Sequence, residues 1–173
     1  MNAYITSTGA FLPGPPVSND EMEDILGFVD GMKSRLKRRI LEANGIVTRH
    51  YAIDADHNTC YSVTDMGVRA ARECLDKAGI PPSRVAMLGV ASTQGDLPAP
   101  GLGSMVQGEL GIPEVELLTA HGICSSSAMA WKAAFNTIRV GDQPNALVVV
   151  SELPSRMFKH TRYEAAGGRK CVD

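Results

Sequence analysis

The spacing of apolar residues changes along the chain and separates expected helices from expected strands. Between Val63 and Ala78, apolar side chains recur every three to four residues, which predicts a helix with one buried face. Three shorter runs are almost continuously apolar, as is typical of strands buried on both faces of a parallel sheet. These runs are residues 85–91, 115–120 and 146–151.

Polar residues and glycines mark where the helices begin and end. Ser62 and Asp65 form a capping-box pattern at the start of the helix described above, and Gly79 is its expected end. The alternation of helix and strand after Ser62 favours an α/β layered domain with a mostly parallel sheet covered by helices. Other predicted helices are 20–26 (with Asn19 as N-cap), 33–44, 103–110 and 125–139, and predicted extended segments are 4–8 and 46–53.

Composition and charge narrow the possible partners. The 173 residues, 44% hydrophobic and 21% charged, fit a single domain spanning residues 1–173. A net charge of -2 gives no electrostatic case for binding nucleic acid. The longest apolar run, residues 146–150, is far shorter than the ~20 residues that a membrane-spanning helix needs. The N-terminus lacks the basic stretch and apolar core of a signal peptide, so we expect a cytoplasmic protein with no membrane partner.

Four cysteines occupy different contexts. The spacing of Cys60, Cys74, Cys124 and Cys171 matches no zinc-binding pattern, so no metal is expected. Cys74 falls on the apolar stripe of its predicted helix, and Cys60 and Cys171 lie in polar loops. Cys124 instead follows a predicted strand and a glycine, and it directly precedes a predicted helix.

A thiol at the start of a helix is well placed for nucleophilic chemistry. Unpaired backbone N–H groups and the helix dipole favour an anion there, and the thiolate is the reactive form of cysteine. Ser125 and the small residues after it leave room for a substrate near the backbone, whose N–H groups are placed to bind an oxyanion. The alternative for Cys124 is a small buried hydrophobic side chain, the commonest role of a lone cysteine.

Five segments share their order and spacing with one known family. They are residues 8–13, 44–51, 70–80, 115–130 and 148–152. Together they resemble the β-ketoacyl-acyl-carrier-protein synthase III group (ketosynthase III) of the thiolase superfamily, over nearly the whole chain. The resemblance implies the N-terminal half of a thiolase-like layered fold. In that family the catalytic His and Asn lie in the second half, which we expect to be absent from this chain.

The resemblance also implies an acyltransferase. In this family an acyl group moves from a thioester onto the cysteine, and a decarboxylating malonyl-carrier thioester supplies the carbanion that attacks it, giving a β-ketoacyl product. Cys124 is then the nucleophile, Ser125 lies beside the substrate, and Arg156 matches a residue that contacts coenzyme A. Acyl-coenzyme A and acyl-carrier protein are the expected substrates, no separate cofactor is expected, and family members pair as homodimers.

Two positions depart from the family pattern. Ala43 stands where family members often place an Arg that contacts coenzyme A, so this contact is not expected here. Ala99 lies in the loop that reaches the partner subunit's acyl pocket, at a position that carries a bulky side chain in related enzymes. Ala99 therefore predicts a deeper pocket that accepts medium-length acyl chains. The basic run at residues 33–39 is interpreted as a solvated helix face rather than as a site for coenzyme phosphates or carrier protein.

Other functions stay open at this point. Cys124 could pass its acyl group to a hydroxyl or an amine without decarboxylation, or the chain could be a non-catalytic partner or scaffold half-domain. A hydroxymethylglutaryl-synthase-like function is disfavoured, because that group needs a Glu in the loop at residues 92–101, which has Asp96 but no Glu. His121 lies three residues before Cys124 and is interpreted as packing or hydrogen-bonding locally rather than as a catalytic base.

Overall fold

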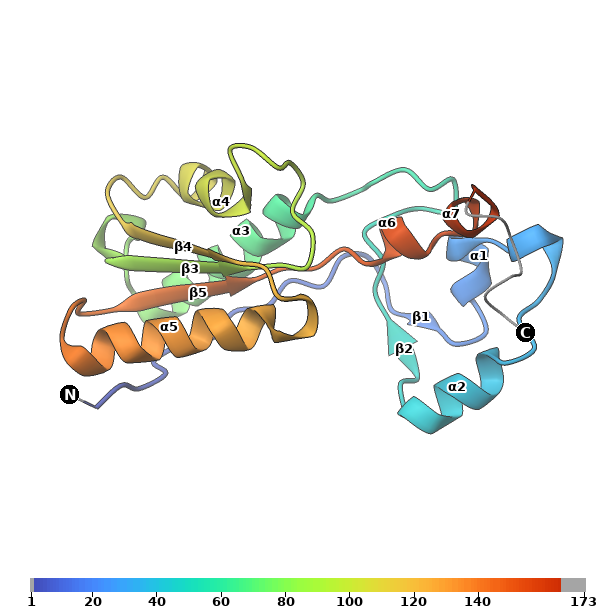
Figure 1. Cartoon of the computed structure of the whole chain (residues 1–173), viewed down its shortest axis with the longest axis horizontal. Coiled ribbons are helices and arrows are strands. Elements are labelled where there is room, and N and C mark those ends of the chain that lie inside the picture. Colours follow the sequence, from blue (N-terminus) through green and yellow to red (C-terminus); the bar gives the residue numbers. More distant parts are fainter. Residues whose placement is uncertain (1, 166–173) are drawn as a thin grey trace. The chain divides into compact units, whose positions relative to one another are not determined.

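The structure is a computed structural model that describes residues 2–165 (Figure 1). Cys171, expected to lie in a polar loop, is outside the described residues. The described residues divide into two compact units. The first unit comprises residues 2–11 and 62–152, and the second comprises residues 12–61 and 153–165.

A parallel sheet forms the centre of the first unit. Its strands are β3 (Met87–Ala91), β4 (Glu116–Ala120) and β5 (Ala146–Val150), in the spatial order β4-β3-β5. Both pairs are parallel, with Met87 opposite Glu116 on one side and opposite Ala146 on the other. The three apolar runs of the sequence are therefore the three strands of this sheet, which confirms the predicted parallel α/β architecture.

Helices cover both faces of this sheet. α4 (Leu102–Leu110) and α5 (Ser126–Val140) lie on opposite sides of it (Figure 1). α3 (Val63–Ala78) packs against α4 and β5. α4 and β4 approach each other closely at Gly103. A side chain at this position would overlap the hydroxyl of Thr119, so only glycine fits there. A short helical turn, η2 (Pro82–Arg84), joins α3 to β3.

The core of the first unit is built around the central strand. Every residue of β3 is buried, as expected for a strand with neighbours on both edges and helices on both faces. Leu88 and Val90 are inaccessible to solvent, and α3 and α4 contribute Val63 and Val106, which are equally buried. The predicted capping box of α3 is confirmed, since Ser62 Oγ accepts from Asp65 N at 2.9 Å and Asp65 Oδ2 accepts from Ser62 N at 3.2 Å.

The predicted strand at residues 4–8 is wrong. This segment forms no strand, and its hydrogen bonds run to α3 instead. Ser7 Oγ donates to the carbonyl of Cys74 at 2.9 Å, and Ala10 N donates to Glu73 Oε2 at 3.0 Å. A strand needs a neighbouring strand edge for its backbone groups, and within the described residues no strand pairs with this segment.

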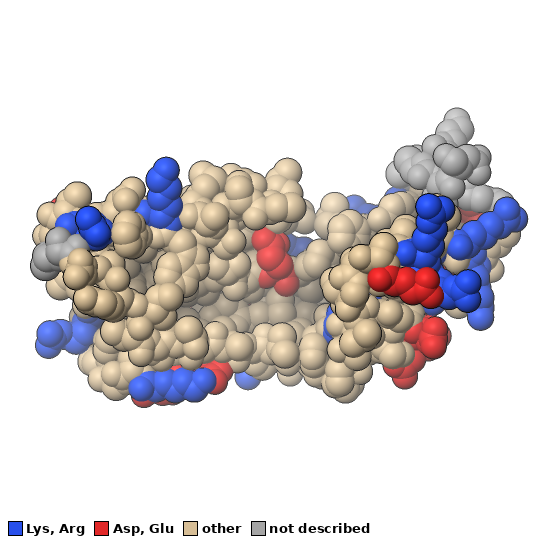
Figure 2. All heavy atoms as spheres, turned by 90° about the horizontal axis from the view of Figure 1, so that it is seen from below, with Lys and Arg blue, Asp and Glu red and all other residues tan. Residues whose placement is uncertain are grey.

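The second unit consists of short elements. They are β1 (Val17–Ser18), α1 (Met22–Leu26), η1 (Val29–Gly31), α2 (Lys37–Asn44), β2 (Thr48–Arg49), α6 (Ser155–Phe158) and α7 (His160–Ala165). β1 and β2 pair in antiparallel fashion. Figure 2 shows many of the Lys and Arg side chains visible in that view over this unit.

Several predicted boundaries in the second unit are wrong. Asn19 is not an N-cap, because its amide donates to the carbonyl of Ile46 at 3.0 Å and α1 begins only at Met22. The basic helix begins at Lys37 rather than at residue 33. Glu23 explains this later start, since its carboxylate accepts from Ser34 N at 3.2 Å and from Lys37 Nζ at 2.7 Å. The long extended segment at 46–53 shortens to the two residues of β2.

Candidate active site

Cys124 lies in a tight turn between β4 and α5. The strand ends at Ala120, the helical turn η3 (Ile123–Ser125) follows Gly122, and α5 begins at Ser126. Cys124 is an exposed free thiol. The placement agrees with the predicted position just before a helix, and it does not agree with the alternative of a buried hydrophobic cysteine.

An uncommon backbone conformation precedes this thiol. Ile123 has a φ of 51°, in the left-handed region that β-branched residues rarely adopt. Its side chain is 68% exposed, so core packing does not explain the conformation. Backbone strain of this kind occurs often at functional sites, where the surrounding structure holds it in place. The turn reverses the chain at Ile123 and leaves Cys124 at the surface.

Two serine hydroxyls hold the turn closed. Ser126 Oγ accepts from Gly122 N at 2.8 Å and donates to the carbonyl of Ile123 at 2.8 Å. Ser125 Oγ donates to the carbonyl of Gly122 at 2.7 Å. Ser126 is almost fully buried, whereas Ser125 is exposed. The sequence indicates only that the residues here are small. It does not reveal that Ser126 positions the turn, because the hydrogen-bond partners of Ser126 depend on the conformation of the turn.

The same turn limits which backbone groups can bind an oxyanion. The N–H of Ser125 donates to the carbonyl of Gly122 at 3.0 Å, and the N–H of Gly122 donates to Ser126 Oγ. Both donors are therefore engaged within the turn. The expectation that backbone N–H groups at this helix start bind an oxyanion therefore does not extend to these two.

His121 joins the turn to the loop after β3. Its Nδ1 lies 3.0 Å from the carbonyl of Ser92, and Ser92 is fully buried. A carbonyl oxygen only accepts, so Nδ1 donates this hydrogen bond. The hydrogen bond agrees with the predicted structural role of His121, although its partner is 29 residues away along the chain.

The loop at residues 92–101 is anchored by Asp96, which the sequence did not single out as structural. Asp96 Oδ1 accepts from Val63 N at 3.0 Å, and Oδ2 accepts from Thr64 N at 2.8 Å and from Thr64 Oγ1 at 2.7 Å. The carboxylate thus caps the first turn of α3, where N–H groups lack helical partners. Ala99, the predicted acyl-pocket residue, is exposed further along the same loop.

The predicted site residues fall in both units. Cys124, Ser125 and Ala99 belong to the first unit, in the loops that follow the carboxyl ends of β4 and β3. That end of a parallel sheet is where ligands of layered α/β domains bind. Arg156 lies in α6, which belongs to the second unit.

The described residues offer few other candidates for a metal site or a reactive thiol. Within residues 2–165, no three His, Cys, Asp or Glu side chains lie close enough together to hold a metal ion. Cys60 is exposed and Cys74 is half-buried, and both are free thiols. None of the described helices has the length and apolar character needed to cross a membrane.

Comparisons with known proteins agree with this arrangement. The chain is 33% identical over 158 residues to a β-ketoacyl-[acyl-carrier-protein] synthase III of Caulobacter vibrioides, covering 91% of this chain and 45% of that protein. A solved tetronic acid condensing enzyme superposes with a TM-score of 0.75 at 27% identity, over 88% of this chain and 46% of that one. The 3-oxoacyl-[acyl-carrier-protein] synthase III of Aquifex aeolicus VF5 gives a TM-score of 0.72 at 26% identity, over 87% and 45%. No protein-family model matches the sequence.

The sheet, its covering helices and these superpositions define a thiolase-like fold. Within that fold the chain corresponds to the N-terminal half of a ketosynthase III, which confirms the resemblance stated from the sequence. The chain spans about half the length of the curated relatives it matches.

Proposed function

We propose that this chain is the acyl-accepting half of a ketosynthase III-type condensing enzyme, with Cys124 as its nucleophile. The observation that carries the proposal is the exposed thiol of Cys124, which directly precedes the 15-residue helix α5. The turn that holds this thiol contains a residue with positive φ and is closed by serine hydrogen bonds. A thiol at such a helix start is favoured as a thiolate, and the thiolate attacks carbonyl carbon. Relatives named β-ketoacyl-[acyl-carrier-protein] synthase III support the reaction class.

The proposed first step is a thioester exchange. The thiolate of Cys124 attacks the carbonyl carbon of an acyl-coenzyme A and forms a tetrahedral intermediate. Its collapse breaks the bond between the carbonyl carbon and the coenzyme sulfur, which leaves with the electron pair and is protonated. The acyl group remains on Cys124 as a thioester, ready for the carbanion that a decarboxylating malonyl-carrier thioester provides.

The partners of the reaction follow from the same proposal. Acyl-coenzyme A and acyl-carrier protein are the substrates, with Ser125 and Arg156 beside them, and the working protein is a cytoplasmic homodimer. The carrier protein is supported by the printed names of the relatives. The resemblance assigns the second step to a His and an Asn of the other half of the fold.

Mass spectrometry of the intact chain tests the thioester. After incubation with acetyl-coenzyme A or octanoyl-coenzyme A, we expect one acyl adduct per chain in the wild type and none in Cys124→Ala. Cys60→Ala is the matched control, since Cys60 is also an exposed free thiol, and it should keep the adduct. Far-UV circular dichroism checks that both variants fold.

The outcomes separate the candidate functions. An adduct that survives in Cys124→Ala contradicts the assigned nucleophile. A folded wild-type chain that acquires no adduct from either donor contradicts the proposal and leaves the scaffold function. Release of the acyl group to an added amine or alcohol, without malonyl-carrier thioester, would instead favour non-decarboxylative transfer.

Ala99 provides a separate proposal about chain length. Its methyl group stands where related enzymes carry a bulky side chain, so we propose a deeper acyl pocket. In competition between acetyl and octanoyl donors, the octanoyl adduct should form faster, and Ala99→Phe should reverse this preference. A wild-type preference for acetyl over octanoyl would contradict the deeper pocket.

A further inference from the structure

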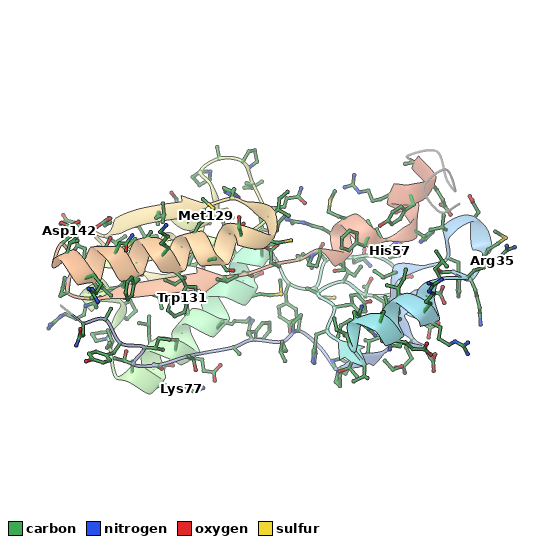
Figure 3. The ribbon with its side chains drawn as sticks, turned by 60° about the horizontal axis from the view of Figure 1, so that its bottom comes forward. Arg35, His57, Lys77, Met129, Trp131 and Asp142 are labelled. Carbon is green, nitrogen blue, oxygen red and sulfur yellow. The ribbon has the colours of Figure 1, made fainter. Side chains whose placement is uncertain are left out.

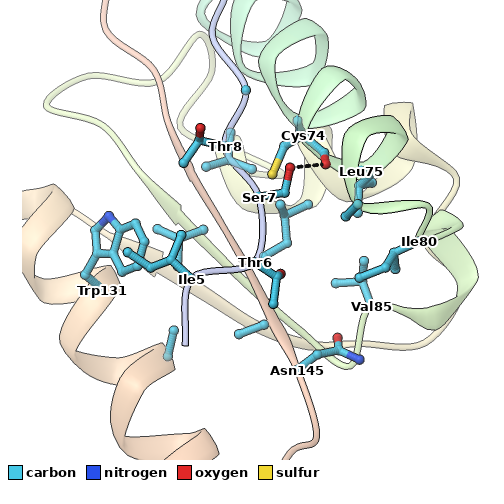
Figure 4. A pocket seen from close by; sticks show the side chains of 18 of the residues that line it. Ile5, Thr6, Ser7, Thr8, Cys74, Leu75, Ile80, Val85, Trp131 and Asn145 are labelled. Carbon is cyan, nitrogen blue, oxygen red and sulfur yellow. Dashed lines mark hydrogen bonds between the residues drawn. The ribbon is translucent and has the colours of Figure 1, made fainter. Parts of the chain in front are cut away.

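Two of the apolar surfaces of this protein differ in charge. In the first unit, a groove of 360 Å³ lies between the N-terminal segment, residues 3–9, and strand β5. Figure 4 shows this groove with Ile5 near Trp131 and the Ser7 hydroxyl bonded to α3. No charged side chain is among the described residues that line it. The other surface is the segment at residues 32–47 of the second unit, where apolar and basic side chains are mixed.

Segment 32–47, which contains α2, exposes large apolar side chains. Five of them are between 44% and 72% exposed: Met32, Leu36, Ile40, Ile46 and Val47. Water in contact with apolar groups is unfavourable, and a cluster of exposed apolar residues with polar neighbours is typical of an interaction site. The segment is therefore a candidate docking surface.

One side of α2 attaches the helix to its unit. Lys37 and Leu41, one turn apart, are half-buried, and all other residues of α2 are exposed. Lys37 Nζ binds Glu23 Oε2 at 2.7 Å. Partial burial raises the pKa of the Glu23 carboxyl, but its hydrogen bonds, foremost the one from Lys37, outweigh this and hold the pKa below its ordinary value, so the ion pair is charged at neutral pH. Leu36 and Ile40 are also one turn apart and form an apolar pair on the exposed surface.

Basic side chains accompany these apolar residues. Four of them in this segment are exposed: Lys33, Arg35, Arg38 and Arg39. Arg35 points outward from the second unit (Figure 3). Glu42 is the only acidic residue between residues 32 and 47, and its 3.6 Å contact with Arg38 is highly exposed and therefore weak. The segment is thus positively charged, although the whole chain has a net charge of -2.

The mixing of basic and apolar side chains favours a lipid surface over a protein partner. Arg35 directly precedes Leu36, and Arg39 directly precedes Ile40. The buried centre of a protein–protein interface is depleted of charged residues, which gather at its rim. Helices in a membrane interface do combine the two kinds, because long basic side chains keep their aliphatic stems among apolar groups while their charged ends reach lipid phosphates. Charge complementarity therefore indicates a partner that is both apolar and anionic.

We propose that segment 32–47 docks onto an anionic lipid bilayer, with Leu36 and Ile40 inserted below the headgroups and the exposed basic side chains bound to lipid phosphates. Such binding is peripheral and needs no membrane-spanning helix, and none of the described helices could span a membrane. It departs from the expectation of no membrane partner, which considered only spanning helices and signal peptides. The proposal does not depend on the chemistry of Cys124.

Sedimentation of the full chain with lipid vesicles tests the proposal. Vesicles of phosphatidylcholine mixed with phosphatidylglycerol should bind the chain, and vesicles of phosphatidylcholine alone should bind it weakly. Binding to the anionic vesicles should decrease as salt is added, because salt screens exposed charges. A folded chain that does not bind the anionic vesicles, or that binds both kinds equally, overturns the proposal.

Charge variants show whether this segment is the surface that binds. Arg35→Gln combined with Arg39→Gln should weaken binding to the anionic vesicles by about tenfold or more, since each basic residue near such a surface contributes substantially. Arg84→Gln combined with Lys132→Gln is the matched control, because it removes two exposed charges from the first unit. Equal weakening by the two double variants would mean that total charge, and not this segment, decides binding.

Apolar variants show whether side chains insert. Leu36→Ser combined with Ile40→Ser should weaken binding by about tenfold or more, because apolar burial is lost. Tyr4→Ser combined with Ile5→Ser, at exposed apolar positions of the groove, should leave binding unchanged. Far-UV circular dichroism checks that all the variants fold. Full binding by the Leu36 and Ile40 double variant would show adsorption by charge alone and would contradict insertion.

Tryptophan fluorescence reports insertion directly. The chain has one tryptophan, so Leu36→Trp in a Trp131→Phe background places a single reporter on the segment. Its emission should shift to shorter wavelength on the anionic vesicles and should be quenched by lipids brominated in their acyl chains. Unchanged emission from vesicle-bound protein overturns the proposed insertion.

An acidic acyl-carrier protein is the competing partner for a basic surface. Its binding to the wild type and to the two segment variants can be measured by surface plasmon resonance. If the variants lose carrier binding while vesicle binding stays as in the wild type, the surface serves a protein and the proposal is wrong. Loss of vesicle binding alone supports the lipid surface.

Discussion

The turn at Cys124 and the groove beside β5 lie in the same unit and differ in how their backbone groups are satisfied. In the turn, Ser125 and Ser126 bond to groups within four residues of themselves. Beside β5, the edge groups face a groove, and the N-terminal segment is tied to a helix. The hydrogen bonds of the turn lie within one stretch of sequence, whereas no strand of the described residues pairs with the edge of β5 that faces the groove.

This difference separates features that one stretch of sequence forms from features that need a distant segment. A turn built from local hydrogen bonds needs no distant segment, so the nucleophile position forms with β4 and α5. A strand edge pairs with a segment that can lie far away in the sequence, and within residues 2–165 β5 pairs only with β3.

The largest expected effect on stability comes from Ser126→Ala. Ser126 is 1% exposed, and its loss leaves the N–H of Gly122 and the carbonyl of Ile123 without their partner. We expect the free energy of unfolding to fall by about 1–2 kcal/mol, because two part-buried hydrogen bonds are lost. Urea denaturation measures this change. The acyl adduct on Cys124 should also form more slowly.

Ser127→Ala is the matched control for this variant. Ser127 is the next residue of α5 and is half-buried. Its replacement should change the free energy of unfolding by less than about 0.5 kcal/mol. An equal loss in both variants would mean that the turn is not held by Ser126.

A smaller effect is expected in the wall of the groove. Ser7→Ala removes the bond from Ser7 Oγ to the carbonyl of Cys74, which is part-buried. The free energy of unfolding should fall by about 1 kcal/mol. Ile5→Ser should cost less than about 0.5 kcal/mol in the isolated chain, because Ile5 is 68% exposed. A larger loss in Ile5→Ser than in Ser7→Ala would contradict an open groove.

The sequence predicts the fold best where the signal is local. Continuous apolar runs identified β3, β4 and β5, and the Ser62–Asp65 pattern correctly placed the start of α3. The strand predicted at 4–8 failed because no described strand pairs with this segment, and a local pattern cannot show whether a partner exists. The helix predicted from residue 33 failed because Glu23, ten residues earlier, binds the chain at Ser34.

The candidate site likewise combines features that a local sequence pattern predicts with features that depend on distant residues. The position of Cys124 before a helix follows from strand, glycine and helix patterns in one segment, so the sequence could predict it. Asp96 could not be predicted as an anchor, because it caps a helix that begins 33 residues earlier. His121 likewise bonds to Ser92, a residue on another loop. The catalytic roles of Cys124, Ser125, Arg156 and Ala99 stay predictions.

The most direct test of the central claim compares two thiols in one molecule. Cys124 and Cys60 are both exposed, but only Cys124 precedes a long helix. Under limiting iodoacetamide at neutral pH, peptide mass spectrometry measures the alkylation rate of each. The account predicts that Cys124 reacts about tenfold or more faster, because a helix start stabilises the negative charge of an attacking sulfur. Equal rates, or faster reaction at Cys60, would contradict an activated nucleophile in this turn.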